Sequence, residues 1–249
     1  MEVIKFKYNN LEYYGKVEGN EVFELINFDF SKEFFETGFS VPKCDVEVIS
    51  PIKPSKIIGI ALNNKKLVGP KKKYDEPLIF LKSPTSLTFS NSIGIPKSNK
   101  VWVEVEIGLV IKKSGKKISK ENAKNYIFGH LICNDMTMEN AHNRDHHLAR
   151  SKSLDGFCPS NNSIFTDINT DCLIMKTFIN GTNMQNGNSK DRILNDFECI
   201  ELVSKFITLE KGDLILTGTV NNAMNCIVKS GDEVKMIIEQ LGDYNFKIK

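Results

Sequence analysis

The chain has 249 residues, of which 41% are hydrophobic and 9% aromatic. It can therefore bury a sizeable core, and it is neither a disordered tail nor a miniprotein held together by disulfides. The 33 lysines and arginines nearly balance the 31 aspartates and glutamates, and a net charge of +2 argues against a nucleic-acid or membrane partner. No apolar run approaches a membrane span, and the first ten residues lack the apolar core of a secretory signal, so we expect a cytoplasmic protein.

The first thirty residues predict a β-meander. Apolar residues alternate over 2–8, 11–17 and 21–26, and turn dipeptides stand at 9–10 and 19–20. A short helix is expected from Ser31 to Gly38, and the three prolines in 42–54 are typical of a linker. We therefore expect a small N-terminal β domain with its linker over residues 1–53 and a catalytic domain over residues 54–249.

The rest of the chain is rich in strand patterns. They cover 56–62, 77–81, 101–111, 126–135, 172–179, 213–219, 233–241 and 244–249. Two helices are expected, one from Ser119 and one from Asn195, where Glu198 completes a capping box. The expected class is mainly β with a few helices (α+β), and not a doubly wound α/β fold.

The six cysteines lie far apart and include no C-x-x-C pair, which argues against a structural zinc site. We expect them to be buried, reduced thiols.

Two acidic residues interrupt the apolar strand 101–111. Alternation places Glu104 and Glu106 on the same face, about 7 Å apart at Cα. Side by side they repel each other unless a positive group lies between them, and carboxylate pairs suit Mg²⁺ or Mn²⁺. The alternative is a solvent-exposed face of an antiparallel sheet. Asp135, at the end of strand 126–135, is either a turn former or a third carboxylate of the same site.

From about Lys56 to the C-terminus the sequence resembles the fumarylacetoacetate hydrolase family. Eight segments match in order: PSKIIGIALN, PLIFLKSPTSL, VEVEIGLVI, FGHLICNDMT, KSLDGFCP, NGTNMQNGN, LVSKFITLEKGDLILTGT and SGDEVKMIIEQLG. The resemblance implies a β-sandwich or roll catalytic domain behind a small N-terminal domain, and a homodimer. It points to the branch of acylpyruvate hydrolases, oxaloacetate decarboxylases and 2-hydroxyhepta-2,4-diene-1,7-dioate isomerases.

The resemblance also assigns roles to residues. It implies that Glu104, Glu106 and Asp135 are the metal ligands, and that Lys152 faces the substrate oxyanion. Gly218 and Thr219, in the T-G-T segment, are implied to contact the substrate carboxylate.

Several family positions carry different residues here. Leu67 stands where the family has a catalytic histidine, and leucine cannot transfer a proton. Glu139 stands in place of a substrate-binding arginine, Asn64 in place of a tyrosine and Val220 in place of a proline.

Three histidines follow Asp135, namely His142, His146 and His147. They are interpreted as part of an exposed polar loop, with two alternatives. His142 is a candidate base that compensates for Leu67, or His142 and His146 form a second metal site with Glu139.

The sequence therefore favours a divalent-metal-dependent enzyme that acts on a small anionic 2-oxo or β-dicarbonyl acid. C–C hydrolysis, decarboxylation and keto–enol isomerisation through a metal-stabilised enolate all stay open. The alternatives are a family member that binds metal and an oxo acid without turnover, and a purely structural β protein.

Overall fold

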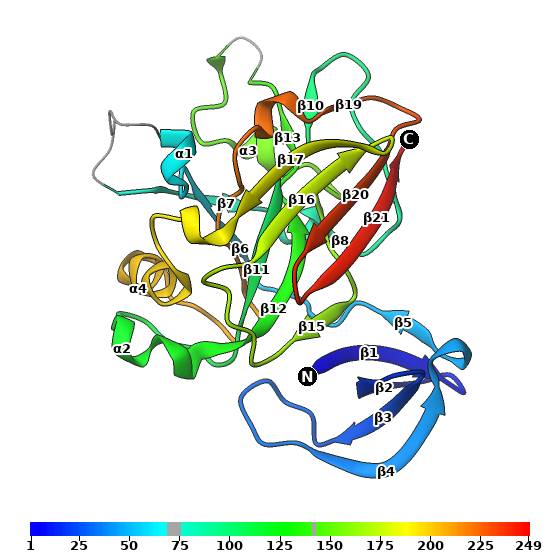
Figure 1. Ribbon diagram of the computed structural model, residues 1–249. Helices are drawn as coiled ribbons and strands as arrows, with labels where there is room; N and C mark the ends of the chain where they lie inside the picture. The colour runs from blue at the N-terminus through cyan, green and yellow to red at the C-terminus, as the bar shows by residue number, and fades with distance from the viewer. Residues whose placement is uncertain (69–75, 141–142) are drawn as a thin grey trace.

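The computed structural model describes residues 1–68, 76–140 and 143–249, and in these residues the chain folds into β-sheets with short helices (Figure 1). The strands are β1 (Glu2–Tyr8), β2 (Leu11–Glu18), β3 (Glu21–Ile26), β4 (Phe35–Pro42), β5 (Glu47–Ile49), β6 (Ile57–Ala61), β7 (Leu78–Lys82), β8 (Leu87–Thr88), β9 (Ser92–Ile93), β10 (Val101–Trp102), β11 (Val105–Ile111), β12 (Ile127–Asn134), β13 (Thr137–Met138), β14 (Cys158–Pro159), β15 (Ser163–Phe165), β16 (Ile174–Ile179), β17 (Thr182–Asn188), β18 (Leu214–Leu216), β19 (Ile227–Val228), β20 (Glu233–Ile238) and β21 (Gly242–Ile248). The helices are α1 (Lys65–Val68), α2 (Lys120–Ala123), α3 (Ala149–Lys152) and α4 (Asp196–Phe206).

The largest sheet has the order β4-β3-β2-β1-β15-β12-β11-β18-β6-β7, and β5 pairs with β1. All seven residues of β11 are buried, which explains its nearly continuous apolar sequence. A second sheet, β17-β16-β20-β21-β9, packs its inner face against the segment that leads into β11. The site described below lies at the start of β11, beside this packed region.

The predicted N-terminal meander is confirmed, because β1, β2 and β3 pair antiparallel in order. The predicted helix from Ser31 to Gly38 is wrong. Asp29 Oδ1 accepts hydrogen bonds from the N–H and hydroxyl of Ser31, and the chain then enters β4. Strand β4 pairs with β3 and places Val41 opposite Val22, in a buried cluster with Phe6. This long-range apolar contact outweighs the local signal for a helix.

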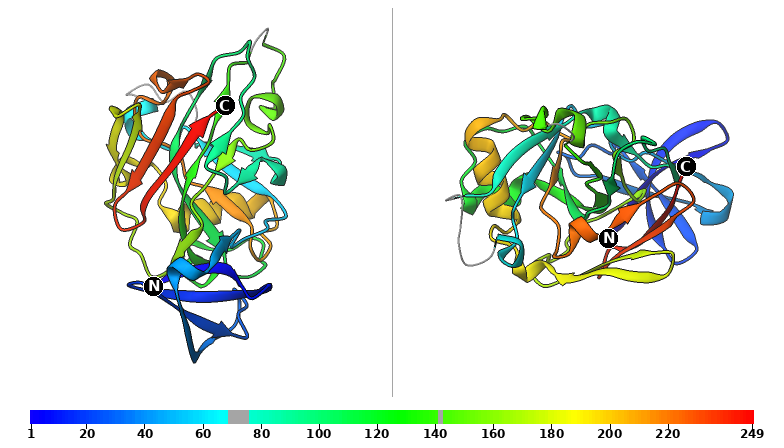
Figure 2. Two further views of the ribbon diagram at one scale, coloured as in Figure 1. Left: turned by 90° about the vertical axis from the view of Figure 1, so that its right-hand side faces the viewer. Right: turned by 90° about the horizontal axis from the view of Figure 1, so that it is seen from above.

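The N-terminal strands lie together at one end of the molecule (Figures 1 and 2). Strand β1 pairs with β15 of the following region, and the Phe30 and Phe128 ring centroids lie 4.7 Å apart. The proline-rich segment is not only a linker, because it contains β5. The division of the chain at residue 53 stays a prediction.

The predicted class, mainly β with a few helices, is confirmed. Both predicted helix starts are also confirmed: Ser119 occupies the N-cap position of α2, and Asn195 and Glu198 form the capping box of α4. Within the described residues, no helix is long and apolar enough to cross a membrane.

The expectation for the cysteines is correct for four of the six. Cys133, Cys158, Cys199 and Cys226 are buried free thiols, whereas Cys44 and Cys172 are free but exposed. The two exposed residues lie in a surface turn after β4 and in the loop before β16, outside the apolar clusters.

Candidate metal centre and cavity

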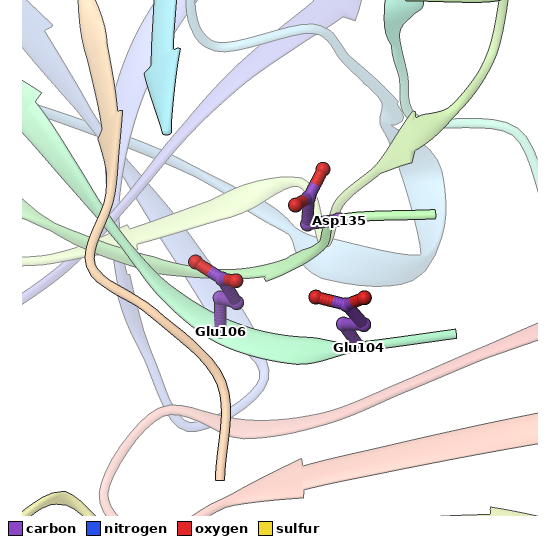
Figure 3. A group of neighbouring side chains, drawn as sticks. All are labelled: Glu104, Glu106 and Asp135. Atoms are coloured by element: carbon purple, nitrogen blue, oxygen red, sulfur yellow. The ribbon is translucent and has the colours of Figure 1, made fainter. Parts of the chain in front are cut away.

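Three carboxylates gather where β11 begins and β12 ends. Glu106 lies in β11, Glu104 directly precedes this strand, and Asp135 directly follows β12. The antiparallel register pairs Val105 with Asn134, and the Asp135 N–H donates to the Glu104 carbonyl at 2.9 Å. One carboxylate oxygen from each residue lies within 4.8 Å of the others. Figure 3 shows the three side chains turned toward a common region.

The chain around the cluster fixes its geometry. The regular strand is interrupted between β10 and β11, so the sequence 101–111 forms two strands rather than the single predicted one. In this break, Trp102 Nε1 donates to Glu104 Oε1 at 2.6 Å, and the Thr137 hydroxyl donates to the same oxygen at 3.0 Å. The Gly218 N–H donates to Glu106 Oε2 at 2.7 Å. Two of the three carboxylates are therefore held in place by neutral donors.

Two buried lysines contact the cluster. Lys152 Nζ forms a salt bridge with Asp135 and lies 3.5 Å from Glu104 Oε2. Lys82 Nζ lies 2.7 Å from Asp135 Oδ1, and the Lys82 side chain has no exposed surface. The sequence interpretation missed Lys82. The available signal was a lysine directly after the apolar strand 77–81. A lysine in such a buried segment needs a partner of opposite charge, because lysine is rarely buried without one.

The surroundings shift the pKa values of Glu106 and Asp135 in opposite directions. Burial raises the pKa of Glu106 well above its usual value, and the charges of Asp135 and Glu104 raise it further. Burial also opposes ionisation of Asp135, but the charges of Lys152 and Lys82 outweigh it and hold the pKa of Asp135 below its usual value. Lys152 is likewise buried, yet the charges of Asp135 and Glu104 raise the pKa of its ammonium group.

Charge and donor chemistry make this cluster suitable for a divalent cation. Three carboxylates face two ammonium groups, so a negative charge remains uncompensated when all are ionised. Oxygen donors from carboxylates are the ligands preferred by Mg²⁺ and Mn²⁺. The exposed-face alternative is wrong for Glu106, which is only 3% exposed.

A cavity of about 510 Å³ opens beside the carboxylates. It is lined by Ile60, Ala61, Leu62, Leu67, Trp102, Glu104, Glu106, Asp135, Thr137, Lys152, Thr219, Asn222, Ala223, Met224 and Asn225. This size suits a small organic ligand. A larger hollow, about 770 Å³, lies over β16, β20 and β21, and none of the three clustered carboxylates lines it. We base the candidate site on the smaller cavity because it contains the convergent charged groups.

The T-G-T segment lies beside the cluster. Gly218 has a φ of +95°, and an added Cβ would lie 2.9 Å from Asn63 Cβ, so the position requires glycine. Thr219 lines the cavity, and its hydroxyl donates to the Val105 carbonyl at 2.9 Å. The Gly218 N–H therefore orients Glu106, and the Thr219 hydroxyl bonds to the backbone of β11. Their contact with a substrate stays a prediction.

The remaining candidates are placed as follows. Leu67 belongs to α1 and lines the cavity. His142 lies outside the described residues, so its proposed role as a base, and a second metal site that includes it, stay predictions. His146 and His147 are exposed, and neither lines the cavity. Glu139 is half-buried, and its N–H donates to the Lys100 carbonyl.

The family model described as fumarylacetoacetate (FAA) hydrolase C-terminal matches residues 56–249. The chain therefore belongs to the fumarylacetoacetate hydrolase family, as its sequence motifs indicated. An uncharacterised protein of Methanocaldococcus jannaschii is 37% identical over 200 residues, which cover 78% of this chain and 83% of that protein.

Solved structures agree with this assignment. The structure of 2-hydroxyhepta-2,4-diene-1,7-dioate isomerase from Mycobacterium marinum is 28% identical, with a TM-score of 0.87 over 100% of this chain and 98% of that one. Maleylpyruvate hydrolase from Sphingobium sp. SYK-6, in complex with manganese(II) and pyruvate, is 22% identical, with a TM-score of 0.77 over 100% of this chain and 98% of that one. The second likeness shows the fold alone.

Proposed function

We propose that this protein is a divalent-metal-dependent enzyme that acts on a small 2-oxo or β-dicarbonyl acid. The observation that carries the proposal is the convergence of Glu104, Glu106 and Asp135 at the wall of a ligand-sized cavity. These three residues would hold Mg²⁺ or Mn²⁺, which when bound supplies Lewis-acid polarisation of a carbonyl oxygen. The family, and the manganese and pyruvate bound by maleylpyruvate hydrolase, support this choice.

The chain's own residues would then position and stabilise the substrate. Lys152 is held at the cavity by Asp135 and Glu104, which keep its side chain charged. An ammonium group in this place stabilises negative charge that develops on a substrate oxygen. Trp102 and Thr137 keep Glu104 in one orientation, so the carboxylate cluster is preorganised before a ligand arrives.

We infer the reaction type from Leu67, because this side chain has no group that transfers a proton. Its side chain lines the cavity but cannot orient a water molecule or accept a proton. We therefore propose keto–enol isomerisation or decarboxylation ahead of C–C hydrolysis, with His142 as the candidate base. Full activity of the variant His142→Ala would remove that role.

Leu67 also supports a second candidate function. A protein that retains the carboxylate cluster but lacks the usual base could bind a metal and an oxo acid without turning it over. By analogy with its family we propose a homodimer, which sedimentation equilibrium would test.

The deciding experiment measures turnover of a panel of 2-oxo and 2,4-dioxo acids with Mg²⁺ or Mn²⁺, by ultraviolet loss of the enol and by product mass. Glu106→Gln is the test variant, and Glu33→Gln is its matched control because Glu33 is exposed and does not line the cavity. We expect metal-dependent turnover that only Glu106→Gln abolishes. Metal and pyruvate binding without turnover would favour the second candidate, and absence of metal binding would overturn the proposal.

A further inference from the structure

Much of the cavity wall beyond the charged cluster is apolar. The side chains of Leu62, Leu67, Ala223 and Met224 come from two segments that are far apart in the sequence, and they line the same cavity as the carboxylates. Leu62 and Leu67 are each 38% exposed, and Met224 is 75% exposed. Large apolar side chains that gather at the opening of a cavity are typical of a surface that binds a ligand.

The backbone at Leu62 is held in a conformation that leucine rarely adopts. Its φ is +62°, in the left-handed region. The next residue, Asn63, is buried and fixes this geometry through its side chain. Its amide group donates to the carbonyls of Thr217 and Leu194, and its oxygen accepts from the Leu194 N–H at 2.7 Å. An unfavourable conformation that the surrounding structure enforces at a cavity indicates a functional role for the side chain it positions.

The described part of the lining offers no free cation for a second anionic group. Lys152 is the one lysine or arginine among these lining residues, and it already forms a salt bridge with Asp135 and lies close to Glu104. A carboxylate that contacted Leu67 and Met224 would lose water without gaining a charged partner, which is unfavourable.

We infer that the substrate has one oxo-acid head group and an uncharged aliphatic or aromatic chain that packs against Leu62, Leu67 and Met224. The inference rests on the proposed function, which supplies the binding site of the head group. It adds the chemistry of the rest of the substrate and names the residues that select it.

Binding by the manganese-loaded protein tests the inference without requiring turnover. Calorimetric titration would compare pyruvate, 2-oxobutanoate, 2-oxopentanoate and 2-oxohexanoate, which share a head group and lengthen by one methylene at a time. We expect Kd to fall by up to about fourfold for each added methylene. 2-Oxoadipate has the same number of carbons as 2-oxohexanoate but ends in a carboxylate, and we expect it to bind about tenfold more weakly.

Variants of the apolar residues that line the cavity test which side chains cause the dependence of affinity on chain length and charge. Met224→Ala should flatten the dependence on chain length, and Leu67→Lys should narrow or reverse the preference for 2-oxohexanoate over 2-oxoadipate. Ile174→Lys is the matched control, because Ile174 is a similarly exposed apolar residue that does not line this cavity. It should leave both measurements unchanged.

The outcomes separate the inference from the proposed function. If pyruvate binds but affinity does not change with chain length, or 2-oxoadipate binds at least as tightly as 2-oxohexanoate, the inference is wrong and the proposed function stands. If the protein binds manganese but neither pyruvate nor any longer acid, the proposed substrate class is overturned and the inference with it.

Discussion

The Lys82 ammonium group lies 2.7 Å from Asp135 Oδ1, and both side chains are almost completely buried. Lys82 comes from the end of β7 and Asp135 from the residue after β12, so this contact ties two distant segments of the chain together at the carboxylate cluster. A buried carboxylate needs such a partner, because removing one member of a buried ion pair leaves the other charge uncompensated.

Replacing Lys82 by methionine should therefore destabilise the metal-free protein. We expect a loss of about 3–5 kcal/mol in the free energy of unfolding, measured by urea denaturation. Manganese should restore part of this loss, because the cation would compensate the charge on Asp135. Lys5→Met, which breaks the more exposed contact with Glu12, is the control and should have little effect. A Lys82→Met protein as stable as wild type without metal would contradict this account of the cluster.

Gly218 connects the backbone of the T-G-T segment to the carboxylate cluster. Gly218→Ala adds a Cβ at 2.9 Å from Asn63 Cβ in a backbone with φ of +95°, so the segment must move. We expect a loss of about 1–3 kcal/mol in stability, and weaker manganese binding because the Gly218 N–H would no longer orient Glu106. Gly94→Ala is the control, since its added Cβ meets no atom within 4 Å. Equal melting temperatures for both variants would show that the position tolerates a side chain.

The carboxylate cluster could be predicted from the sequence, for reasons that differ between its members. Strand alternation alone placed Glu104 and Glu106 together. The local pattern left Asp135 as either a turn former or a third carboxylate, and only the family resemblance assigned it to the site. The contact of Lys82 with Asp135 could not be predicted, because it depends on how the tertiary fold brings the ends of β7 and β12 together, although three strands lie between them in the sheet.

The limits of local sequence patterns also explain the errors in the predicted fold. The local sequence predicts that a helix starts at the turn after Asp29. In the structure this segment leads into β4, which is stabilised by its pairing with β3. The apolar wall of the cavity was not predicted either. Leu62 and Met224 are 162 positions apart, and their positions at the cavity follow from the left-handed backbone at Leu62 and from the tertiary fold.

Glu106 is the carboxylate of the cluster whose ionised form is least favoured without a metal, because among the described residues it forms no salt bridge with a lysine and has Asp135 and Glu104 beside it. Glu106→Gln keeps an oxygen that can accept from the Gly218 N–H but removes the charge. We expect the metal-free variant to melt about 2–4 °C higher than wild type, which corresponds to about 1 kcal/mol in a chain of this size. Manganese should raise the melting temperature of wild type and of the exposed control Glu33→Gln, but not that of Glu106→Gln. A variant that manganese still stabilises would exclude Glu106 as a ligand.

A second buried charge cluster gives the protein a specific sensitivity to acid. Asp196, the first residue of α4, accepts from Arg192 Nη1 and from the Thr170 hydroxyl, both at 2.6 Å, and lies 2.9 Å from His130 Nε2. Burial opposes ionisation of Asp196, but the hydrogen bond to His130 and the charge of Arg192 outweigh it and hold its pKa below the usual value. The folded state therefore favours the charged form.

Asp196→Asn should lower the free energy of unfolding by about 3–5 kcal/mol at pH 7, because Arg192 is left buried without its counter-ion. A depressed folded pKa contributes stability above the unfolded value of about 3.9 and loses that contribution as pH falls toward the folded pKa. The difference between wild type and Asp196→Asn should thus shrink as pH falls below about 4. Urea denaturation between pH 7 and pH 3 measures this difference in the free energy of unfolding. Asp171→Asn is the control, because Asp171 is exposed. A difference that stays the same down to pH 3 would mean that Asp196 acts through its shape and hydrogen bonds rather than its charge.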